Sequence, residues 1–248
     1  MLHMLAYSKS TDATADVDIT PVQDDIIAIQ NSHFLPQKDV KVLAAVAIAT
    51  TLARAKIVTP ALRQLSPPFI RPIITANLPI TIPGVADYRD CPLTLKGLEE
   101  VAIQATQTAA GPTQCNIGLQ IDTGSTPPSP QGQCITMRGT ATTTLVANSW
   151  TSLTVTWADT LPVGRYACVG LQVKGATAIL ARLIFDGQIE RPGCVAQTLL
   201  ADNGHPMFRK GGMGVWGYFT SNQMPIVQVL ANVADTSQEI YLDFIRVA

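Results

Sequence analysis

The chain has 248 residues, of which 17 are Lys or Arg and 18 are Asp or Glu, so its formal net charge at pH 7 is −1. This balance excludes a strongly basic nucleic-acid-binding protein and an acidic disordered tail. Charged residues make up only 14% of the chain, against roughly 25% in an average soluble domain.

The shortage of charge has two interpretations. Interface cores between subunits are poor in charge, so the deficit predicts extra buried contact surface, chiefly with other copies of the same chain. The alternative is a β protein, rich in Thr, Ser and Gln, whose solvent-facing surface is polar but uncharged. The charge that exists is unevenly spread, with a net −4 over residues 1–37, +5 over 38–71 and −2 over 72–248.

The first residues are polar and rich in turn formers, as in Ser8-Lys-Ser-Thr-Asp. Such a segment buries little apolar surface by itself. We therefore predict an N-terminal arm over residues 1–35 that is flexible or ordered only by a partner. No apolar stretch typical of a signal peptide begins the chain.

Apolar residues recur at spacings of three and four between Pro36 and Lys56, which is typical of an amphipathic helix. Pro36 suits a first helical turn, Asp39 suits the N-terminal end, and Arg54 suits the C-terminal end. The apolar run within this segment, residues 42–53, is much shorter than the roughly 18 to 20 residues that cross a bilayer. The sequence therefore predicts a buried or docking helix and no membrane span.

A second short helix is predicted from Thr59, an N-cap followed by a proline, to about Leu65. Together these elements form a predicted helical segment over residues 36–66. Its apolar side chains have little to pack against within one copy, so we expect them to contact neighbouring copies. The predicted assembly positions are Val42, Leu43, Val46 and Leu52.

Residues 67–248 are predicted to form one β domain. Apolar and polar residues alternate with period two in many runs, separated by turn signals such as Asp186-Gly. The predicted strands cover 99–108, 115–122, 150–157, 165–173, 178–185, 215–220, 226–231 and 239–247. The fold class is therefore mainly β, an antiparallel β-sandwich of jelly-roll type with an N-terminal arm and one or two α-helices. The alternative is two small jelly rolls divided near Thr160, and the sequence contains no internal repeat that decides between them.

Asp122-Thr-Gly-Ser matches the core motif of pepsin-like and retroviral aspartic proteases, and the residues before it resemble that family's apolar strand. The resemblance implies a homodimer in which two copies of Asp122 share a proton and activate water. Pro127 and Pro128 depart from the family pattern, because proline does not suit the strand that should follow. The same four residues are also ordinary strand-to-turn chemistry.

Other chemical motifs are weak. Gly212-Met-Gly-Val-Trp-Gly217 has dinucleotide-type spacing, but strand-like residues follow it where a helix is required, so we expect close backbone approach or a bulge there. The three histidines lack metal-ligand spacing, and no cofactor is predicted. The cysteines are odd in number and widely spaced, which favours a reducing compartment over a zinc site or a disulfide framework. They are Cys91, Cys115, Cys134, Cys168 and Cys194.

The basic segment could contact phosphates, and the candidate residues are Arg54, Lys56, Arg63 and Arg71. Aromatic residues suited to base stacking are sparse around it, so a solvated or intersubunit face that balances the acidic arm is favoured. A set of aromatic residues could instead line a sugar-binding face, although filling of the core or an interface is the favoured role. These residues are Trp150, Trp157, Tyr166, Trp216, Tyr218 and Tyr241.

The layout of a polar arm, an Ala- and Val-rich helix and a charge-poor β-sandwich resembles the jelly-roll capsid and coat proteins of icosahedral viruses and tailless phages, from about residue 36 to the C-terminus. The resemblance implies a non-enzymatic virion protein, assembled in the host cytoplasm, whose partners are copies of itself in an oligomer or shell lattice. Other virion proteins are further candidate partners. The competing hypotheses are a carbohydrate-binding or adhesive β-sandwich and the dimeric aspartic protease through Asp122.

Overall fold

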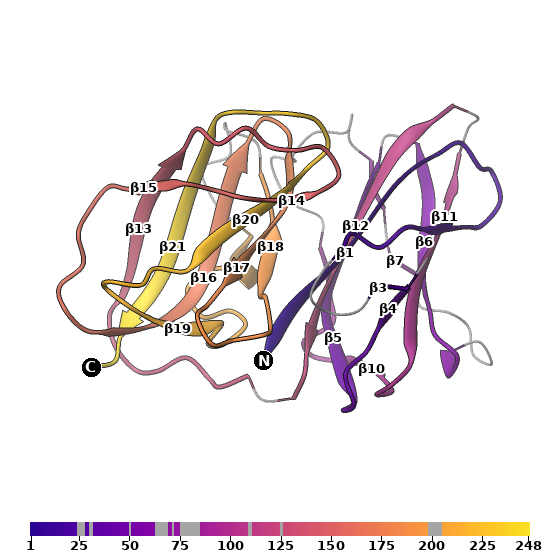
Figure 1. The fold of residues 1–248 in the computed structure, drawn as a ribbon. Coiled ribbons are helices and arrows are strands. Elements are labelled where there is room, and N and C mark those ends of the chain that lie inside the picture. Colours follow the sequence, from indigo (N-terminus) through magenta and orange to yellow (C-terminus); the bar gives the residue numbers. More distant parts are fainter. Residues whose placement is uncertain are drawn as a thin grey trace. The chain divides into compact units, whose positions relative to one another are not determined.

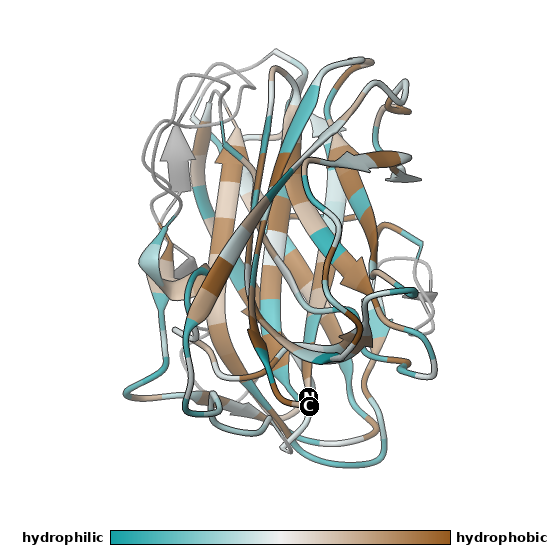
Figure 2. Cartoon of the chain, turned by 90° about the vertical axis from the view of Figure 1, so that its left-hand side faces the viewer, coloured by the Kyte–Doolittle hydropathy of each residue, from teal (hydrophilic) through white to brown (hydrophobic). Residues whose placement is uncertain are grey.

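The computed structural model describes residues 1–23, 28–29, 32–49, 51–62, 69–70, 72–74, 85–108, 111–124, 126–197 and 205–248. This part of the chain consists mainly of β-strands, and nearly all of their pairings are antiparallel. Figure 2 shows strands banded with hydrophobic residues and many hydrophilic residues in the connecting loops. The prediction of a mainly β protein with antiparallel sheets is confirmed.

The chain divides into two compact units. The N-terminal unit is drawn from Met4–Asn77 and Gly84–Gly124, and the C-terminal unit contains Met1–His3 and Ser125–Ala248. This division differs from the three predicted segments and from the predicted alternative boundary near Thr160.

The N-terminal unit contains two sheets, drawn in indigo to magenta in Figure 1. The first has the order β1 (Leu2–Thr11), β12 (Thr113–Asp122), β5 (Val40–Ala49), β10 (Leu93–Leu95), and β8 (Pro72–Ile74) and β9 (Ala86–Asp87) also pair with β5. The second has the order β3 (Ala28–Ile29), β4 (Ser32–Phe34), β11 (Glu100–Gln107), β6 (Leu52–Val58), β7 (Phe69–Ile70), and β2 (Val17–Ile19) pairs with β11.

The C-terminal unit also contains two sheets, whose later strands are orange to yellow in Figure 1. The first has the order β15 (Val155–Trp157), β13 (Cys134–Ala141), β21 (Gln238–Arg246), β16 (Arg165–Gly175), β19 (Gly217–Thr220). The second has the order β14 (Trp150–Ser152), β20 (Ile226–Ala231), β17 (Ala178–Ile184), β18 (Gly193–Val195). A short 3-10 helix, η2 (Pro206–Phe208), precedes β19.

The same strand order occurs in both units. Eight principal strands of each unit can be numbered 1 to 8 along the chain, and they are β1, β4, β5, β6, β7, β10, β11, β12 in one unit and β13, β14, β16, β17, β18, β19, β20, β21 in the other. In each unit one sheet then has the order 1-8-3-6 and the other has the order 2-7-4-5. The chain therefore contains a repeat of topology that its sequence does not reveal.

The predicted helix over residues 36–56 is wrong, because the segment forms β5 and β6. β5 pairs with β12 and β10 and is buried on both faces along most of its length. A strand buried on both faces is apolar at nearly every position, so its sequence also satisfies helical spacing. A shift of register opposite Gln120 and Ile121 leaves Leu43 as an extra residue in β5 and disturbs the alternation further.

The predicted N-terminal arm is also wrong over much of its length. Residues Leu2–Thr11 form β1, which is hydrogen-bonded to β12, and β2 pairs with β11. Leu5 and Tyr7 are buried in the core, and the Tyr7 hydroxyl donates to the carbonyl oxygen of Val101 at 2.7 Å. Strand β1 was not predicted because the polar residues near its end resemble a loop and because its partner, β12, lies about a hundred residues later in the chain.

The core of the N-terminal unit contains side chains from both of its sheets. Inward-facing residues of β1, β5, β10 and β12 pack with residues of β6 and β11 in one hydrophobic cluster. In the C-terminal unit Tyr166, Phe219 and Phe244 form an aromatic group, with ring centroids 5.3 to 5.7 Å apart. Burial of apolar side chains thus holds the two sheets of the N-terminal unit together. In the C-terminal unit the aromatic group packs three strands of one sheet, β16, β19 and β21, against one another.

The predicted strands after residue 99 agree with β11, β12, β16, β17, β19, β20 and β21, with small differences at their ends. The predicted strand over 150–157 is two strands, β14 and β15, which pair in different sheets. The second predicted helix falls partly on residues 63–65, which lie outside the described residues. At its predicted start, the Thr59 hydroxyl accepts from the backbone N–H of Leu62 at 3.2 Å and closes a turn.

Candidate functional site

The predicted assembly positions lie largely inside the N-terminal unit. Val42 and Leu52 belong to its hydrophobic core, and Val46 is also buried. Leu43 is half-buried at the irregular point of β5. The apolar surface that we assigned to neighbouring copies is therefore largely buried within the chain, and the expectation that these residues form an exposed docking face is wrong.

The acidic N-terminal residues and the basic segment meet on the surface of the N-terminal unit. Asp16 accepts from Lys56 Nζ at 2.5 Å and from Arg54 Nη2 at 3.2 Å, and the Thr106 hydroxyl donates to the same carboxylate. The hydrogen bonds from Lys56 and then Thr106 lower the pKa of Asp16 to about 2. We call this group the Asp16 cluster.

This cluster bears on the predicted phosphate contacts. Arg54 and Lys56 both contact Asp16, whose single negative charge offsets one of their two positive charges, so phosphate would compete with an intramolecular carboxylate. This arrangement agrees with the alternative interpretation, in which the basic segment balances the charge of the acidic N-terminal residues. Arg63 and Arg71 lie outside the described residues, and phosphate contact by them stays a prediction.

Asp122 ends β12 and closes a turn. Its Oδ1 accepts from the backbone N–H of Gly124 at 3.0 Å, and Gly124 has a φ of +90°, a conformation that glycine tolerates best. Asp235, in the sequence closest to a second copy of the motif, accepts from the backbone N–H groups of Thr236 and Ser237. Both carboxylates thus accept hydrogen bonds from nearby backbone N–H groups, as Asp commonly does in turns.

The glycines of residues 212–217 lie where other chain segments come close. An added Cβ would stand 2.6 Å from the Met207 carbonyl oxygen at Gly212 and 2.5 Å from the Pro127 carbonyl oxygen at Gly214. The segment continues into strand β19 and not into a helix. The predicted close backbone approach is confirmed, and the helix that a dinucleotide site needs is replaced by a strand.

A pocket with a volume of about 470 Å³ lies at one end of the C-terminal unit. Its wall is formed where β16 begins and β17 ends, by the loop between β17 and β18, by β19 and the loop that follows it, and by Met1. This volume falls within the range of roughly 300 to 1,000 Å³ that is typical of small-molecule sites. It is the candidate functional site.

The strands hold the pocket residues in fixed positions. Phe185 and Phe219 are buried at its base, and Gln188 Nε2 donates to the carbonyl oxygens of Glu190 at 3.1 Å and Trp216 at 3.0 Å. Gly187, with a φ of +70°, makes the turn between β17 and this loop. The loop is therefore tied to the chain just before β19.

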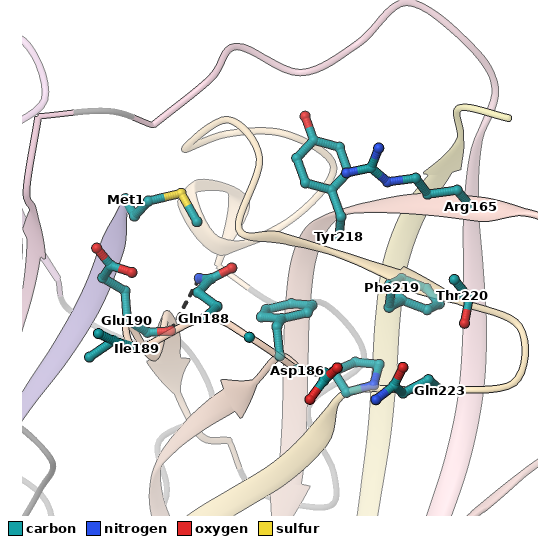
Figure 3. Close-up of a pocket in the computed structure, with 13 residues that line it drawn as sticks. Met1, Arg165, Asp186, Gln188, Ile189, Glu190, Tyr218, Phe219, Thr220 and Gln223 are labelled. Atoms are coloured by element: carbon teal, nitrogen blue, oxygen red, sulfur yellow. Dashed lines mark hydrogen bonds between the residues drawn. The ribbon is translucent and has the colours of Figure 1, made fainter.

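Tyr218 and Arg165 form one side of the pocket. The guanidinium carbon of Arg165 lies 4.6 Å from the centre of the Tyr218 ring, close enough for a cation–π interaction. Figure 3 shows these two side chains together, with Met1 and Glu190 across the pocket and Gln188 pointing into the space between them. Asp186 and Gln223 lie near each other on a further side of the pocket.

The six aromatic residues considered for a sugar-binding face differ in exposure. Trp216 and Tyr166 are buried, as the core-filling role predicts, and Trp150, Trp157 and Tyr241 are half-buried. Tyr218 differs, because 38% of its surface is exposed at the pocket. The alternating pattern identified Tyr218 as an aromatic strand residue but did not distinguish it from the buried ones.

A second polar group, the Asp243 cluster, lies on the C-terminal unit. The Asp243 carboxylate is fully buried and accepts from Arg209 at 2.5 and 3.0 Å, from the Thr136 hydroxyl and from the backbone N–H of Lys210. Burial raises the pKa of Asp243, but the hydrogen bonds from Arg209 and Thr136 outweigh it and leave the pKa below its usual value. Arg209 also donates to Gln172. These contacts anchor the chain after η2 to β21 and β16.

In the described residues, no three His, Cys, Asp or Glu side chains come together in a way that could hold a metal ion. The five cysteines are all free thiols, and burial raises the pKa of Cys115 and Cys194 to about 12. No helix in the described part of the chain combines the length and apolarity needed to cross a bilayer. No model of a known protein family matches the chain, and no curated protein sequence is similar to it.

Proposed function

We propose that the chain is a non-enzymatic structural protein of a virion that assembles with copies of itself, and that each of its two units is a jelly roll. The observation that carries the proposal is the strand order 1-8-3-6 and 2-7-4-5, which occurs twice in the chain. A jelly roll has eight strands in two packed sheets and is a common fold of viral capsid domains.

The pairing agrees with a hairpin of eight strands that has been rolled up. In such a hairpin strand 1 pairs with 8, 2 with 7, 3 with 6 and 4 with 5. The N-terminal unit has these pairs as β1 with β12, β4 with β11, β5 with β10 and β6 with β7. The C-terminal unit has them as β13 with β21, β14 with β20, β16 with β19 and β17 with β18. The mainly antiparallel pairing and the shared core of the first unit support the same description.

Jelly rolls also occur in lectins and cupins, so the fold alone does not determine the function. Two observations favour a shell subunit. Charged residues are only 14% of the chain, and several large apolar side chains of the C-terminal unit are exposed. Contact surfaces between subunits combine these properties, since charge is depleted and apolar area is enriched at their centres.

The exposed apolar side chains replace the buried residues as the candidate assembly surface. Val146 and Val233 are 59% and 54% exposed. They lie in neighbouring loops, joined by a hydrogen bond from the Leu145 N–H to the Asp235 carbonyl oxygen at 2.8 Å. Val163 is 81% exposed on a separate part of this unit. Removal of such side chains from water would stabilise contacts between copies.

Two similar units in one chain suit a shell lattice. A trimer of such chains has six similar units around its threefold axis, and a flat hexagonal lattice needs six neighbours around each tile. Head-to-tail contacts between identical chains close into a ring when the rotation between neighbours permits it. We therefore expect a trimer to be the soluble building block of the shell.

Size-exclusion chromatography with light scattering tests the proposal. The purified chain should have about three times the mass of one 26.5-kDa copy, or form larger particles that negative-stain electron microscopy would reveal. Replacement of Val146 and Val233 by Asp should weaken association, because a charge would have to be buried in the contact. Replacement of both by Thr, which has nearly the same shape and no charge, is the matched control. A chain that stays monomeric at all protein and salt concentrations would contradict the proposal.

A further inference from the structure

We propose that the pocket of the C-terminal unit binds a neutral saccharide, with Tyr218 as the platform for a sugar ring and Asp186, Thr220 and Gln223 as partners for its hydroxyl groups. The inference goes beyond the structural role and does not depend on it. A shell subunit, or a subunit of any other assembly, could carry such a site on an exposed face.

The shape of the pocket suits a small ring compound. Its volume is about 470 Å³, and its lining includes the rings of Phe185 and Phe219 and Pro225, all of which are apolar. Polar side chains from the loop between β17 and β18 and from the loop after β19 also line it. Sites for small molecules usually combine an apolar wall with a few polar groups that fix the orientation of the ligand.

Tyr218 is held in position before any ligand binds. It belongs to β19, its backbone is paired with Ala167 of β16, and the Arg165 guanidinium packs against its ring at 4.6 Å. An aromatic ring offers a flat apolar surface that excludes water, and the C–H groups on one face of a sugar can pack on it. Tyr218 is 38% exposed and lines the pocket, which leaves part of its ring free for this contact.

The hydroxyl-binding groups are of the right chemical types. Ionised Asp accepts two hydrogen bonds through separate oxygens, and Gln and Thr each donate and accept. Within the described residues, the side chains of Asp186, Thr220 and Gln223 make no hydrogen bond to the protein, and all three line the pocket. Adjacent sugar hydroxyls both donate and accept, so this set can bind them without leaving a buried polar group unpaired.

The charges around the pocket give an anionic ligand no net attraction. The carboxylates of Asp186 and Glu190 line it together with the Arg165 guanidinium, which lies against the Tyr218 ring, and with Met1, which carries an amino group. A phosphate, a sulfated sugar or a carboxylated sugar would lose hydration there without a net opposite charge to replace it. A neutral sugar carries no charge that must lose its hydration, and this is why we assign the pocket to neutral saccharides.

The competing occupant is a side chain of a neighbouring copy. Ile189 lines the pocket and is 74% exposed, so the edge of the pocket could also form a contact between subunits. The two occupants predict different results, because a sugar would bind the isolated chain, whereas a subunit contact would change the state of association.

Saturation-transfer NMR with unlabelled neutral methyl glycosides of glucose, galactose, mannose and N-acetylglucosamine tests the proposal on the purified chain. We expect transfer to the ring protons of at least one sugar at millimolar concentration. Tyr218→Ala should weaken its binding by about tenfold or more, which corresponds to the loss of one stacking contact. Tyr218→Phe keeps the platform and should retain binding, and Asp186→Asn should weaken it.

Asp159→Asn removes the same charge from an exposed position outside the pocket and should bind like the original chain. Light scattering on every variant separates this proposal from the proposed assembly. If none of the sugars receives transfer from the original chain, or if Tyr218→Ala binds as well as it does, the saccharide site is refuted. If Tyr218→Ala instead changes the state of association and no sugar binds, the pocket is a subunit contact.

Discussion

The two units share a strand order but differ in where their apolar side chains lie. In the N-terminal unit the central strand β5 is buried on both faces along most of its length. Among the described residues of this unit, Leu98 is the one large apolar side chain that is markedly exposed. The other eight such side chains lie in the C-terminal unit. One topology therefore supports two different surfaces, and the exposed apolar side chains of the described residues lie mainly on the C-terminal unit.

The two units also differ in how deeply their charged clusters are buried. The Asp16 cluster lies on the surface, where the side chain of Asp16 is 26% exposed and that of Arg54 is 52% exposed. In the Asp243 cluster the carboxylate is 0% exposed and Arg209 is 15% exposed. Surface ion pairs contribute little to stability, whereas loss of one partner of a buried pair is costly. The comparison predicts a clear order of mutational effects.

The largest effect is expected for Asp243→Ala. It leaves the largely buried Arg209 guanidinium without its carboxylate, so we expect a loss of about 3 kcal/mol in the free energy of unfolding. Urea denaturation followed by circular dichroism measures it. The double variant Asp243→Ala, Arg209→Met should lose less than the sum of the two single changes, because the uncompensated charge is removed. Additive losses would mean that the two side chains do not act as a pair.

The next effect is expected for Gly217→Ala. The added Cβ would stand 2.5 Å from the Phe185 ring, so Phe185 would have to move within the core. Overpacking of this kind costs about 1 to 3 kcal/mol. Thermal unfolding measures the loss, and Phe185→Leu in the same chain should recover part of it. Gly187→Ala is a useful contrast, because its added Cβ meets nothing within 4 Å and any loss there reflects the φ of +70° alone.

A smaller effect is expected for Asp16→Asn, about 1 kcal/mol or less at neutral pH, since the group is partly exposed. The folded pKa of Asp16 is about 2, below its ordinary value of 3.8. Its contribution is therefore complete above pH 3.8 and is lost as the pH falls towards 2. When the melting temperature is measured as a function of pH, it should fall less steeply between pH 3.8 and 2 in the variant than in the original chain. An unchanged slope would contradict the role given to Asp16.

The smallest effect is expected for Asp122→Asn. Asparagine can also accept the hydrogen bond from the Gly124 N–H, so stability should change by no more than about 0.5 kcal/mol. Association should also be unchanged. Neither chain is expected to cleave generic peptides at acidic pH, and cleavage by the original chain that disappears in the variant would restore the dimeric protease hypothesis.

Alternating residues predicted β11 and β21 from the sequence, because burial of a single face favours a period of two. The strand β13, whose burial also alternates, was missed. The pocket was not predicted, because its residues are far apart in the chain. Arg165, Asp186 and Tyr218 come from separate elements, and only strand pairing places them around one cavity. Among them, the Asp186-Gly turn signal was visible, but a turn gives no indication of a cavity beside it.

The sequence by itself determined that this is a charge-poor protein built mainly of antiparallel strands, since composition and period-two alternation are local properties. The tertiary structure decided that Val40–Ala49 and Leu52–Val58 are strands. In Val40–Ala49, burial on both faces leaves nearly every residue apolar, so the periodicity of the sequence becomes ambiguous. It also decided that the chain contains one topology twice. Strand order depends on pairings between distant residues, and many different side chains satisfy the same pairings.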